Sequence, residues 1–350
     1  MSATEAPGAP AADPGATGPP PEGQRGLKQT LHVGDSWTAW LSQRGVYSAL
    51  LLLLLYNAVA TNNFLTVATI QLLFAQLPPV IIVSLGMALV IGTGGVDLSV
   101  GATMAIASAV LARFVVTGGN GFGQPIAIAI VAAVLVGLLV GVFNGVVVAV
   151  AEVQPIVATL GMLVAGRGIA LVITGGALIE LFVPFFQTVR QGSLFGIPYI
   201  MWVAVLLAGI IAVVVRRTGF GYRVLAIGGN RRASGLAGLP VRRTLITVYA
   251  ISGTLAAIAG VIATARLRAS DPSYIGLLIE LSAITAVVVG GTALSGGQVR
   301  ILGTVAGAIF IQLLETTLVS HNVPDSGARI VEAIIIIAAV YSQRLSGKTR

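Results

Sequence analysis

Side chains that commonly perform enzymatic chemistry are scarce in this sequence. It has no cysteine, and its two histidines, His32 and His321, lie far apart along the chain. A thiol nucleophile, a disulfide framework and a thiolate metal site are therefore excluded, and a zinc centre is not expected because zinc sites need several His, Cys or carboxylate ligands. We expect no catalytic site, no metal site and no cofactor bound by this chain.

Asp97 is the most informative ionisable residue, because it stands between two long uncharged stretches. Its carboxylate can cap a following helix by accepting the amide hydrogen of Ser99 or Val100. Asp97 and Ser99 can also border a translocation path, since an ionisable group within a membrane is costly unless water or a partner reaches it. The two interpretations are compatible, and the sequence leaves both open.

Two further charged residues, Arg167 and Glu280, fall in or beside apolar segments. Arg167 lies twelve residues into the helix that is expected to begin near Pro155, too deep to reach the inner surface of the membrane easily. We therefore expect it either to pair with an acid such as Glu180, which we favour, or to face a polar cavity. Glu280 is expected to pair with Arg266 or Arg268.

The elements that carry these residues are predicted to be membrane helices. Charged residues make up 9% of the 350-residue chain and hydrophobic residues 56%, whereas charge averages about a quarter in soluble domains. The mean hydropathy is +0.97, so one compact core could not hide this apolar surface and lipid must cover the remainder. We predict an all-α membrane protein with broken or re-entrant glycine-rich segments and about ten transmembrane helices. Their centres are expected near residues 53, 79, 107, 137, 165, 207, 255, 287, 311 and 337.

The distribution of basic residues predicts the orientation in the membrane. Fourteen of the twenty Lys and Arg residues fall in segments that a ten-helix topology places in the cytoplasm, as the positive-inside rule requires. Both termini are therefore predicted to be cytoplasmic, and the net charge of +8 reflects topology rather than nucleic-acid binding. We expect a disordered Pro/Ala/Gly-rich cytoplasmic tail over residues 1–30, a transmembrane domain over 45–343 and a cytoplasmic tail over 344–350.

Residues 216–243, the basic segment, carry seven arginines and no acidic residue. Such a segment either rests on anionic lipid headgroups or docks on another protein. A Gly-Gly-Asn turn followed by small residues favours docking, because small side chains let a partner approach the backbone closely. The residues assigned to docking are Gly228, Gly229, Asn230, Arg231, Ala233 and Gly238.

Two glycine patterns predict how helices end and pack. The pattern GGxxLSxG occurs at residues 94–101 and again at 290–297, each time between apolar runs. We interpret both copies as helix breaks or re-entrant turns, which transporters often place beside a substrate path. Separately, Gly137, Gly141 and Gly145 recur every four residues, which is typical of a ridge where two helices pack closely.

Several short motifs together resemble those of a known family. The matching segments are GMALVI (86–91), GVDLSVG (95–101), FNG (143–145), QPIVATLG (154–161), GRG (166–168), AIGGN (226–230) and GGTALSGG (290–297). They resemble the membrane permease subunit of bacterial ABC importers for monosaccharides, of the ribose, xylose and galactofuranose type. The matches cover residues 66–343 in the family's order. One departure is Ser282, because many relatives have an aspartate at the matching position.

The resemblance implies a multi-pass transport subunit, not an enzyme, of an ATP-driven sugar importer in the bacterial cytoplasmic (inner) membrane. It implies a cytoplasmic ABC ATPase that binds ATP and Mg²⁺, a second permease copy or a paralogue that completes a dimer, and an extracytoplasmic sugar-binding protein. Residues 228–239 match the coupling element that sits in a groove of the ATPase. Membrane lipid surrounds such a subunit, and no nucleic acid is expected as a partner. With Asn144, which lies in a matching motif, the candidate residues of the translocation path are Asp97, Ser99, Asn144, Arg167 and Glu280.

Two other classes of transporter stay open. A stand-alone ion-coupled secondary transporter would use Asp97, Glu280 or Glu315 as proton carriers. A passive channel would be lined by the glycine-rich breaks. The lack of an evident relay of acidic residues, together with the basic segment, favours the ATP-driven importer.

Overall fold

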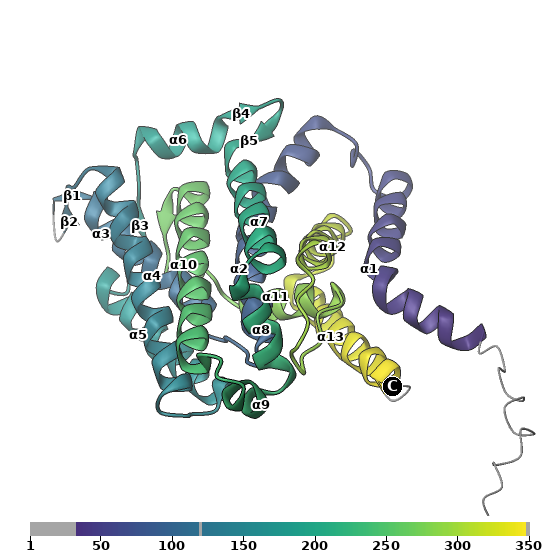
Figure 1. The fold of residues 1–350 in the computed structure, drawn as a ribbon. Helices are drawn as coiled ribbons and strands as arrows, with labels where there is room; N and C mark the ends of the chain where they lie inside the picture. Colours follow the sequence, from purple (N-terminus) through teal and green to yellow (C-terminus); the bar gives the residue numbers. More distant parts are fainter. Residues whose placement is uncertain (1–32, 119–120, 348–350) are drawn as a thin grey trace, which may run out of the picture.

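The chain folds into a bundle of helices with short antiparallel strand pairs at its loops (Figure 1). The computed structural model describes residues 33–118 and 121–347. The predicted tail over residues 1–30 lies outside the described residues, and so do residues 348–350 of the predicted C-terminal tail. Residues 344–347 belong to the final helix.

Helices make up most of the described chain. They are α1 Val33–Ala60, α2 Val67–Gly92, α3 Val100–Val115, α4 Ile126–Ala149, α5 Pro155–Thr174, α6 Pro184–Gln191, α7 Tyr199–Arg217, α8 Gly219–Gly229, α9 Arg231–Leu236, α10 Val241–Leu267, α11 Ile279–Val289, α12 Ile301–Ser320 and α13 Asp325–Gly347. The strands pair antiparallel as β1 Thr117–Gly118 with β2 Gly121–Phe122, β3 Ile179–Glu180 with β6 Ala269–Ser270, and β4 Ser193–Leu194 with β5 Ile197–Pro198.

Each of the ten predicted helix centres falls inside one of these helices. Within the described residues, six helices are long and apolar enough to cross a membrane, namely α2, α4, α5, α7, α10 and α12. Three shorter apolar helices accompany them, at Gly45–Ala60, Val100–Val115 and Ile279–Val289. Six candidate spans are therefore established, and the count of ten stays a prediction.

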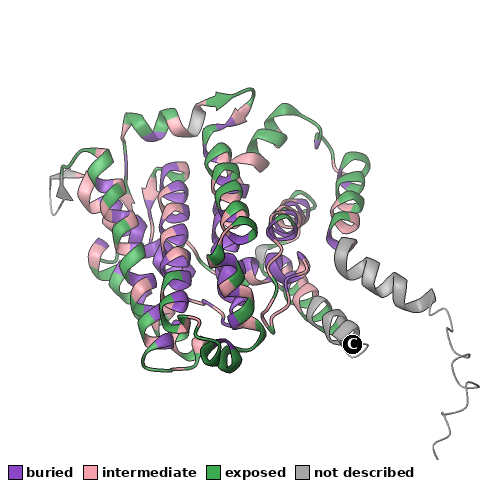
Figure 2. Ribbon diagram, viewed as in Figure 1, coloured by how far each residue is buried: buried purple, intermediate pink, exposed green. Residues whose placement is uncertain are grey.

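Helices α2 and α10 form the centre of the bundle (Figure 2). The most apolar stretch of α2 is 78% buried and that of α10 is 67% buried, whereas the corresponding stretch of α5 is only 17% buried. Helices α4 and α7 likewise expose most of their apolar side chains. A helix that is apolar on its outer face suits lipid rather than water.

The predicted glycine ridge is confirmed, and it joins α4 to α10. A Cβ atom added to Gly145 would lie 2.7 Å from the Cα of Ile246, and one added to Gly253 would lie 2.8 Å from the Cα of Gly141. A Cβ on Gly137 would overlap the side chain of α10 that faces it. These glycines let the two backbones approach directly, as small residues do between membrane helices.

Both copies of the GGxxLSxG pattern follow the end of a helix, as predicted. After α2 the chain turns at Gly94, which has φ +81°, and after α11 it turns at Gly291, which has φ +87°. Glycine adopts these left-handed conformations without steric cost, and each closes its helix by hydrogen bonds to carbonyls of the last turn. The flanking helices α3 and α11 have 16 and 11 residues. At 1.5 Å per residue they are roughly 24 and 17 Å long, less than the hydrocarbon layer of about 30 Å.

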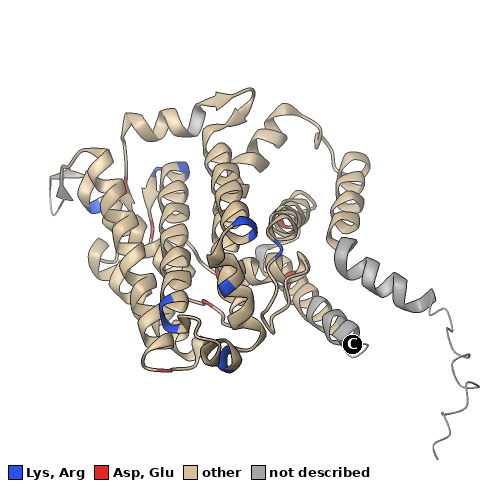
Figure 3. Cartoon of the chain, viewed as in Figure 1, with Lys and Arg blue, Asp and Glu red and all other residues tan. Residues whose placement is uncertain are grey.

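The two ends of the bundle differ in charge and structure. In Figure 1, α6 and the β4–β5 hairpin cover one end of the bundle, and α8 and α9 lie at the other. The arginines of the basic segment lie at the end of α7, in α8 and α9, and at the start of α10 (Figure 3). The end that carries α9 is therefore the more basic one.

Candidate functional site

Asp97 is buried and fully engaged at the break between α2 and α3. Its Oδ1 accepts the backbone amide of Ser99 at 3.0 Å and the Ser99 hydroxyl at 2.6 Å, and its Oδ2 accepts the Ser252 hydroxyl at 2.8 Å. The Asn144 amide nitrogen donates to Ser99 Oγ at 2.8 Å. The hydrogen bond from the Ser99 amide is as predicted, but the residue that caps α3 is Ser99, so Asp97 stabilises the turn before the helix and is not its N-cap.

This cluster of Asp97, Ser99, Asn144 and Ser252, the break cluster, ties the α2–α3 break to α4 and α10. It brings together three of the predicted path residues, and each of its members is at most 1% exposed. A carboxylate that accepts several hydrogen bonds is stabilised in its buried position. In this conformation the break cluster holds helices together, and its predicted place on the path stays a prediction.

Arg167 does not form the pair with Glu180 that we favoured from the sequence. Its Nη1 atom donates to the carbonyl oxygens of Pro272 and Ile275, at 2.7 and 2.6 Å. Glu180 lies in strand β3. The acid with which Arg167 interacts electrostatically is Glu280. Arg167 therefore anchors the loop between β6 and α11.

The predicted pairing of Glu280 is also wrong. Among the described residues no ion pair joins Glu280 to Arg266 or Arg268, and Arg167 and Arg329 are the cations that act on it. Glu280 is 6% exposed, and its Oε2 has no hydrogen-bond partner in the described part of the chain. The sequence could not identify these partners, because Arg167 and Arg329 are far from Glu280 along the chain and only the fold brings them near it.

The basic segment contains two short helices, α8 and α9, between the end of α7 and the start of α10. Asn230 separates α8 from α9, and its side chain caps α9 by accepting the amide hydrogen of Ala233 at 2.9 Å. Helix α9 is exposed apart from Ser234, and Leu236 is 84% exposed. An uncovered apolar side chain beside exposed arginines at one end of the bundle is suited to contact with another protein.

Glycines connect the basic segment to both helix breaks. The backbone amide of Gly297 donates to the carbonyl of Gly92 at 3.0 Å. A Cβ added to Gly228, near the end of α8, would lie 2.5 Å from the Gly297 nitrogen and would overlap the Gly92 carbonyl oxygen. We call Gly92, Gly228 and Gly297 the glycine junction. At the glycine junction the backbone of α8 is in direct contact with the end of α2 and with the α11–α12 loop, because no side chain stands between them.

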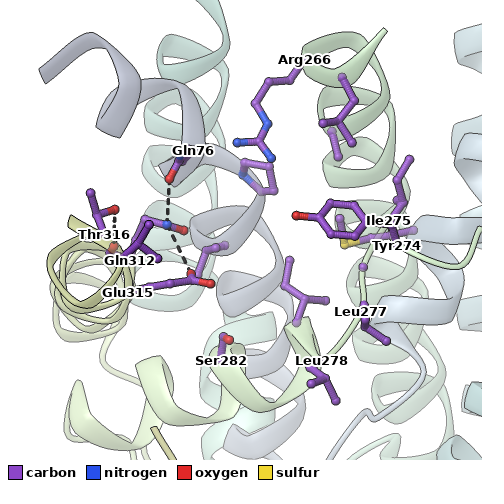
Figure 4. A pocket seen from close by; sticks show the side chains of 18 of the residues that line it. Gln76, Arg266, Tyr274, Ile275, Leu277, Leu278, Ser282, Gln312, Glu315 and Thr316 are labelled. Carbon is purple, nitrogen blue, oxygen red and sulfur yellow. Dashed lines mark hydrogen bonds between the residues drawn. The ribbon is translucent and has the colours of Figure 1, made fainter. Parts of the chain in front are cut away.

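A cavity of about 490 Å³ lies between α2, α10, α11 and α12 (Figure 4). Its lining includes Ala263, which at 1.5 Å per residue is roughly 33 Å from the start of α10. Because the basic segment ends in the first turn of α10, we call this cavity the distal cavity, meaning distal to the basic segment. Its polar lining residues are Gln76, Arg266, Tyr274, Ser282, Gln312, Glu315, Thr316 and Arg329.

Carboxamides and a carboxylate form one wall of the distal cavity. The Gln312 amide nitrogen donates to Gln76 Oε1 at 3.1 Å and to Glu315 Oε2 at 3.4 Å. Figure 4 shows the Tyr274 hydroxyl pointing toward this wall from the other side, with Arg266 at the top of the view. Of these residues, sequence reasoning named Glu315 as a possible carrier and missed both glutamines, although an uncharged amide inside an apolar helix is a recognisable signal.

No group of three or more His, Cys, Asp or Glu side chains suited to a metal ion forms within residues 33–118 and 121–347. The chemistry that the arrangement supports is hydrogen bonding to a solute and mechanical contact with a partner.

Comparison with known proteins identifies the family. A family model described as "Branched-chain amino acid transport system / permease component" matches residues 69–340. The chain belongs to this permease family. It is a membrane-spanning transport component and not an enzyme, as the sequence motifs led us to expect.

Individual relatives match this permease over most of their length. The galactofuranose transporter permease protein of Escherichia coli is 39% identical, with 85% of this chain and 88% of the relative covered. The ribose import permease protein of Bacillus subtilis is 38% identical, over 87% and 93% of the two chains. The fructose import permease protein of Bifidobacterium longum is 33% identical, over 75% and 74%. No solved structure matches the chain.

Proposed function

We propose that this permease imports a monosaccharide or a similar small polyol, delivered from outside by a solute-binding protein and driven by ATP. The observation that carries the proposal is the similarity, over most of both chains, to permeases named for galactofuranose, ribose and fructose.

The basic segment is the proposed docking site for a cytoplasmic ABC ATPase, which binds ATP and Mg²⁺ in place of this chain. Its exposed helix α9, the capping Asn230 and the flanking arginines support this assignment. The docking residues are Gly228, Gly229, Asn230, Arg231, Ala233 and Gly238. We propose further that this end of the bundle and both termini lie in the cytoplasm, and that the protein crosses the bacterial inner membrane about ten times.

Transport is proposed to alternate between an outward-facing and an inward-facing arrangement. ATP binding and hydrolysis in the ATPase bias this equilibrium, and α8 passes the movement through the glycine junction to the two helix breaks. A second permease, identical or paralogous, completes the assembly. Asp97, Ser99 and Asn144 then act by holding the α2–α3 break, and Arg167 and Glu280 by positioning the loop before α11.

A test starts from purification of the tagged chain, expressed with its native gene neighbours, in mild detergent. We expect a stoichiometric ATPase to co-purify and the complex, reconstituted in vesicles with its binding protein, to take up a radiolabelled monosaccharide when ATP is present. The matched control carries an ATPase subunit that lacks the lysine of its phosphate-binding loop.

Two results would overturn this proposal. Uptake by the chain alone under an ion gradient would instead support the secondary transporter. ATP-driven uptake of leucine but of no sugar would assign the substrate class named in the family description.

A further inference from the structure

We propose that the distal cavity is the site at which this permease holds one neutral polyhydroxylated solute during its passage. The inference rests on the proposed importer function and adds to it a location and a set of contacting residues. The cavity volume of about 490 Å³ lies within the range of small-molecule sites, about 300 to 1,000 Å³. It is formed by the two central helices together with α11 and α12.

The chemistry of the cavity wall suits hydroxyl groups. Gln76 and Gln312 supply carboxamides, and each carboxamide has two donors and an oxygen with two lone pairs. The Gln312 amide donates to Gln76 Oε1 at 3.1 Å and to Glu315 Oε2 at 3.4 Å, which leaves the amide donors of Gln76 and the side-chain oxygen of Gln312 for a solute. Ser282 and Thr316 add hydroxyl groups to the same lining. A polyol can replace its hydration shell here by donating to and accepting from the same side chains.

The opposite wall offers an aromatic face and an unused donor. Tyr274 is 62% exposed and points into the cavity, so its ring is available to the apolar face of a sugar (Figure 4). The Nε of Arg266 is buried without a hydrogen-bond partner among the described residues. A buried donor left unpaired costs free energy, and a solute hydroxyl that accepts from it recovers that cost.

The charges around the cavity favour a neutral solute over an ion. Arg329 forms two ion pairs, with 3.7 Å between its Nη2 and Glu315 Oε1 and 3.3 Å between its Nη1 and Glu332 Oε2. Arg266 also interacts electrostatically with Glu315. Two arginines and two glutamates therefore balance one another. A neutral solute keeps this balance, whereas an entering ion would add a net charge beside the Glu315–Arg329 ion pair.

The cavity is connected to the helix breaks through its floor. The loop residues from Tyr274 to Leu278 line the cavity, and Arg167 fixes this loop through the carbonyls of Pro272 and Ile275. A Cβ on Gly276 would overlap the carbonyl of Gly101 in the first turn of α3. The floor thus contacts the helix that follows the α2–α3 break, and a movement of that break changes the cavity.

The test uses the absence of cysteine in the native chain, because a single introduced cysteine becomes the only thiol of this subunit. In the reconstituted complex, Thr316→Cys places a thiol in the cavity, and Gln71→Cys places a control thiol on the exposed face of the same helix as Gln76. The probe is a small thiosulfonate reagent, and the solute is the monosaccharide that the wild-type complex takes up best from a panel of ribose, galactose, fructose and xylose.

We expect saturating sugar to slow labelling of Thr316→Cys at least threefold and to leave Gln71→Cys unchanged. Gln76→Leu should raise the KM for uptake about tenfold, since it removes hydrogen bonds to the solute, whereas Gln71→Leu should not. Tyr274→Ala should raise KM more than Tyr274→Phe, which keeps the ring.

The labelling rate decides the outcome. Equal labelling of Thr316→Cys with and without sugar, in a complex that transports that sugar, would overturn the cavity assignment and leave the importer function standing. A wild-type complex that shows no ATP-dependent uptake of any sugar in the panel would contradict the proposed function itself, and this inference with it.

Discussion

Asp97 shows how one ionisable side chain is accommodated in an apolar bundle. Its two carboxylate oxygens accept three hydrogen bonds from Ser99 and Ser252, so the buried group is satisfied without water. Asp97→Ala would leave these donors unpaired and should destabilise the protein by about 3 kcal/mol, with a smaller loss for Asp97→Asn. Thermal unfolding in lipid nanodiscs measures the difference.

The matched control for Asp97 is Asp271, whose Oδ1 accepts the amide of Ser273 at 2.9 Å in an exposed turn. Asp271→Ala removes the same kind of hydrogen bond where water can replace it, so the loss should stay below about 1 kcal/mol. Equal losses of unfolding free energy for the two alanine variants would show that burial of the break cluster contributes nothing to stability.

Predictability at this scale depends on whether both partners are close in the sequence. The hydrogen bond from the Ser99 amide to Asp97 was predictable because the two residues are two positions apart. The partners of Arg167 were not, because the carbonyls of Pro272 and Ile275 belong to any residue type and carry no sequence signal. Gln76 and Gln312 are 236 residues apart, and only the packing of α2 against α12 brings them together.

At the scale of elements, the glycine junction is the part of the structure that can transmit force from α8. Gly228→Ala places a methyl group against the Gly92 carbonyl and should separate α8 from the break after α2. We expect at least a tenfold loss of ATP-driven uptake per ATP hydrolysed, since the ATPase still docks but its movement is not passed on. Uptake and ATP hydrolysis measured in the same vesicles give this ratio.

Gly209→Ala is the control for the glycine junction, because Gly209 is exposed on α7 with no atom within 4 Å of an added Cβ. It should leave the ratio unchanged. A normal ratio in Gly228→Ala would mean that the close contact between α8 and the break after α2 has no part in coupling.

The cap of α9 gives a separate prediction for docking. Asn230→Ala removes the hydrogen bond to the Ala233 amide and should cost this short helix about 1 kcal/mol. We expect reduced co-purification of the ATPase with normal membrane insertion, and restoration by Asn230→Ser, which keeps a capping oxygen. If Asn230→Ser is as defective as Asn230→Ala, the amide side chain contacts the partner directly.

The sequence predicted elements well where a period or a repeat was present. The four-residue spacing of Gly137, Gly141 and Gly145 predicted the ridge against α10, and the repeated GGxxLSxG pattern predicted two helix ends. The two copies are not equivalent residue by residue, however, because the turn glycine is the first residue of the pattern in one copy, Gly94, and the second residue in the other, Gly291. The contacts of the two breaks with each other and with α8 could not be predicted, because no local pattern encodes contacts between distant turns.

For the whole molecule, orientation is the property on which the coupling proposal depends. Composition and the basic segment predicted a membrane protein with a basic end. In the structure the β4–β5 turn, which contains Phe195, and α9, which contains Leu236, lie beyond opposite ends of the single helix α7. Both side chains are more than 80% exposed, at 88% and 84%. A comparison of these two positions therefore reports orientation without depending on how many of the other helices cross the membrane.

Single-cysteine variants at these two positions test the orientation. In spheroplasts, a membrane-impermeant maleimide should label Phe195→Cys at once and label Leu236→Cys only after the membrane is permeabilised, because α9 must face the ATPase in the cytoplasm. The native chain, which has no cysteine, sets the background. The reverse pattern would place the seven arginines outside, against the positive-inside rule, and would exclude docking of a cytoplasmic ATPase on α9. The end of the bundle that holds the distal cavity would then face the cytoplasm, so this one measurement also places Gln76 and Gln312 relative to the two sides of the membrane.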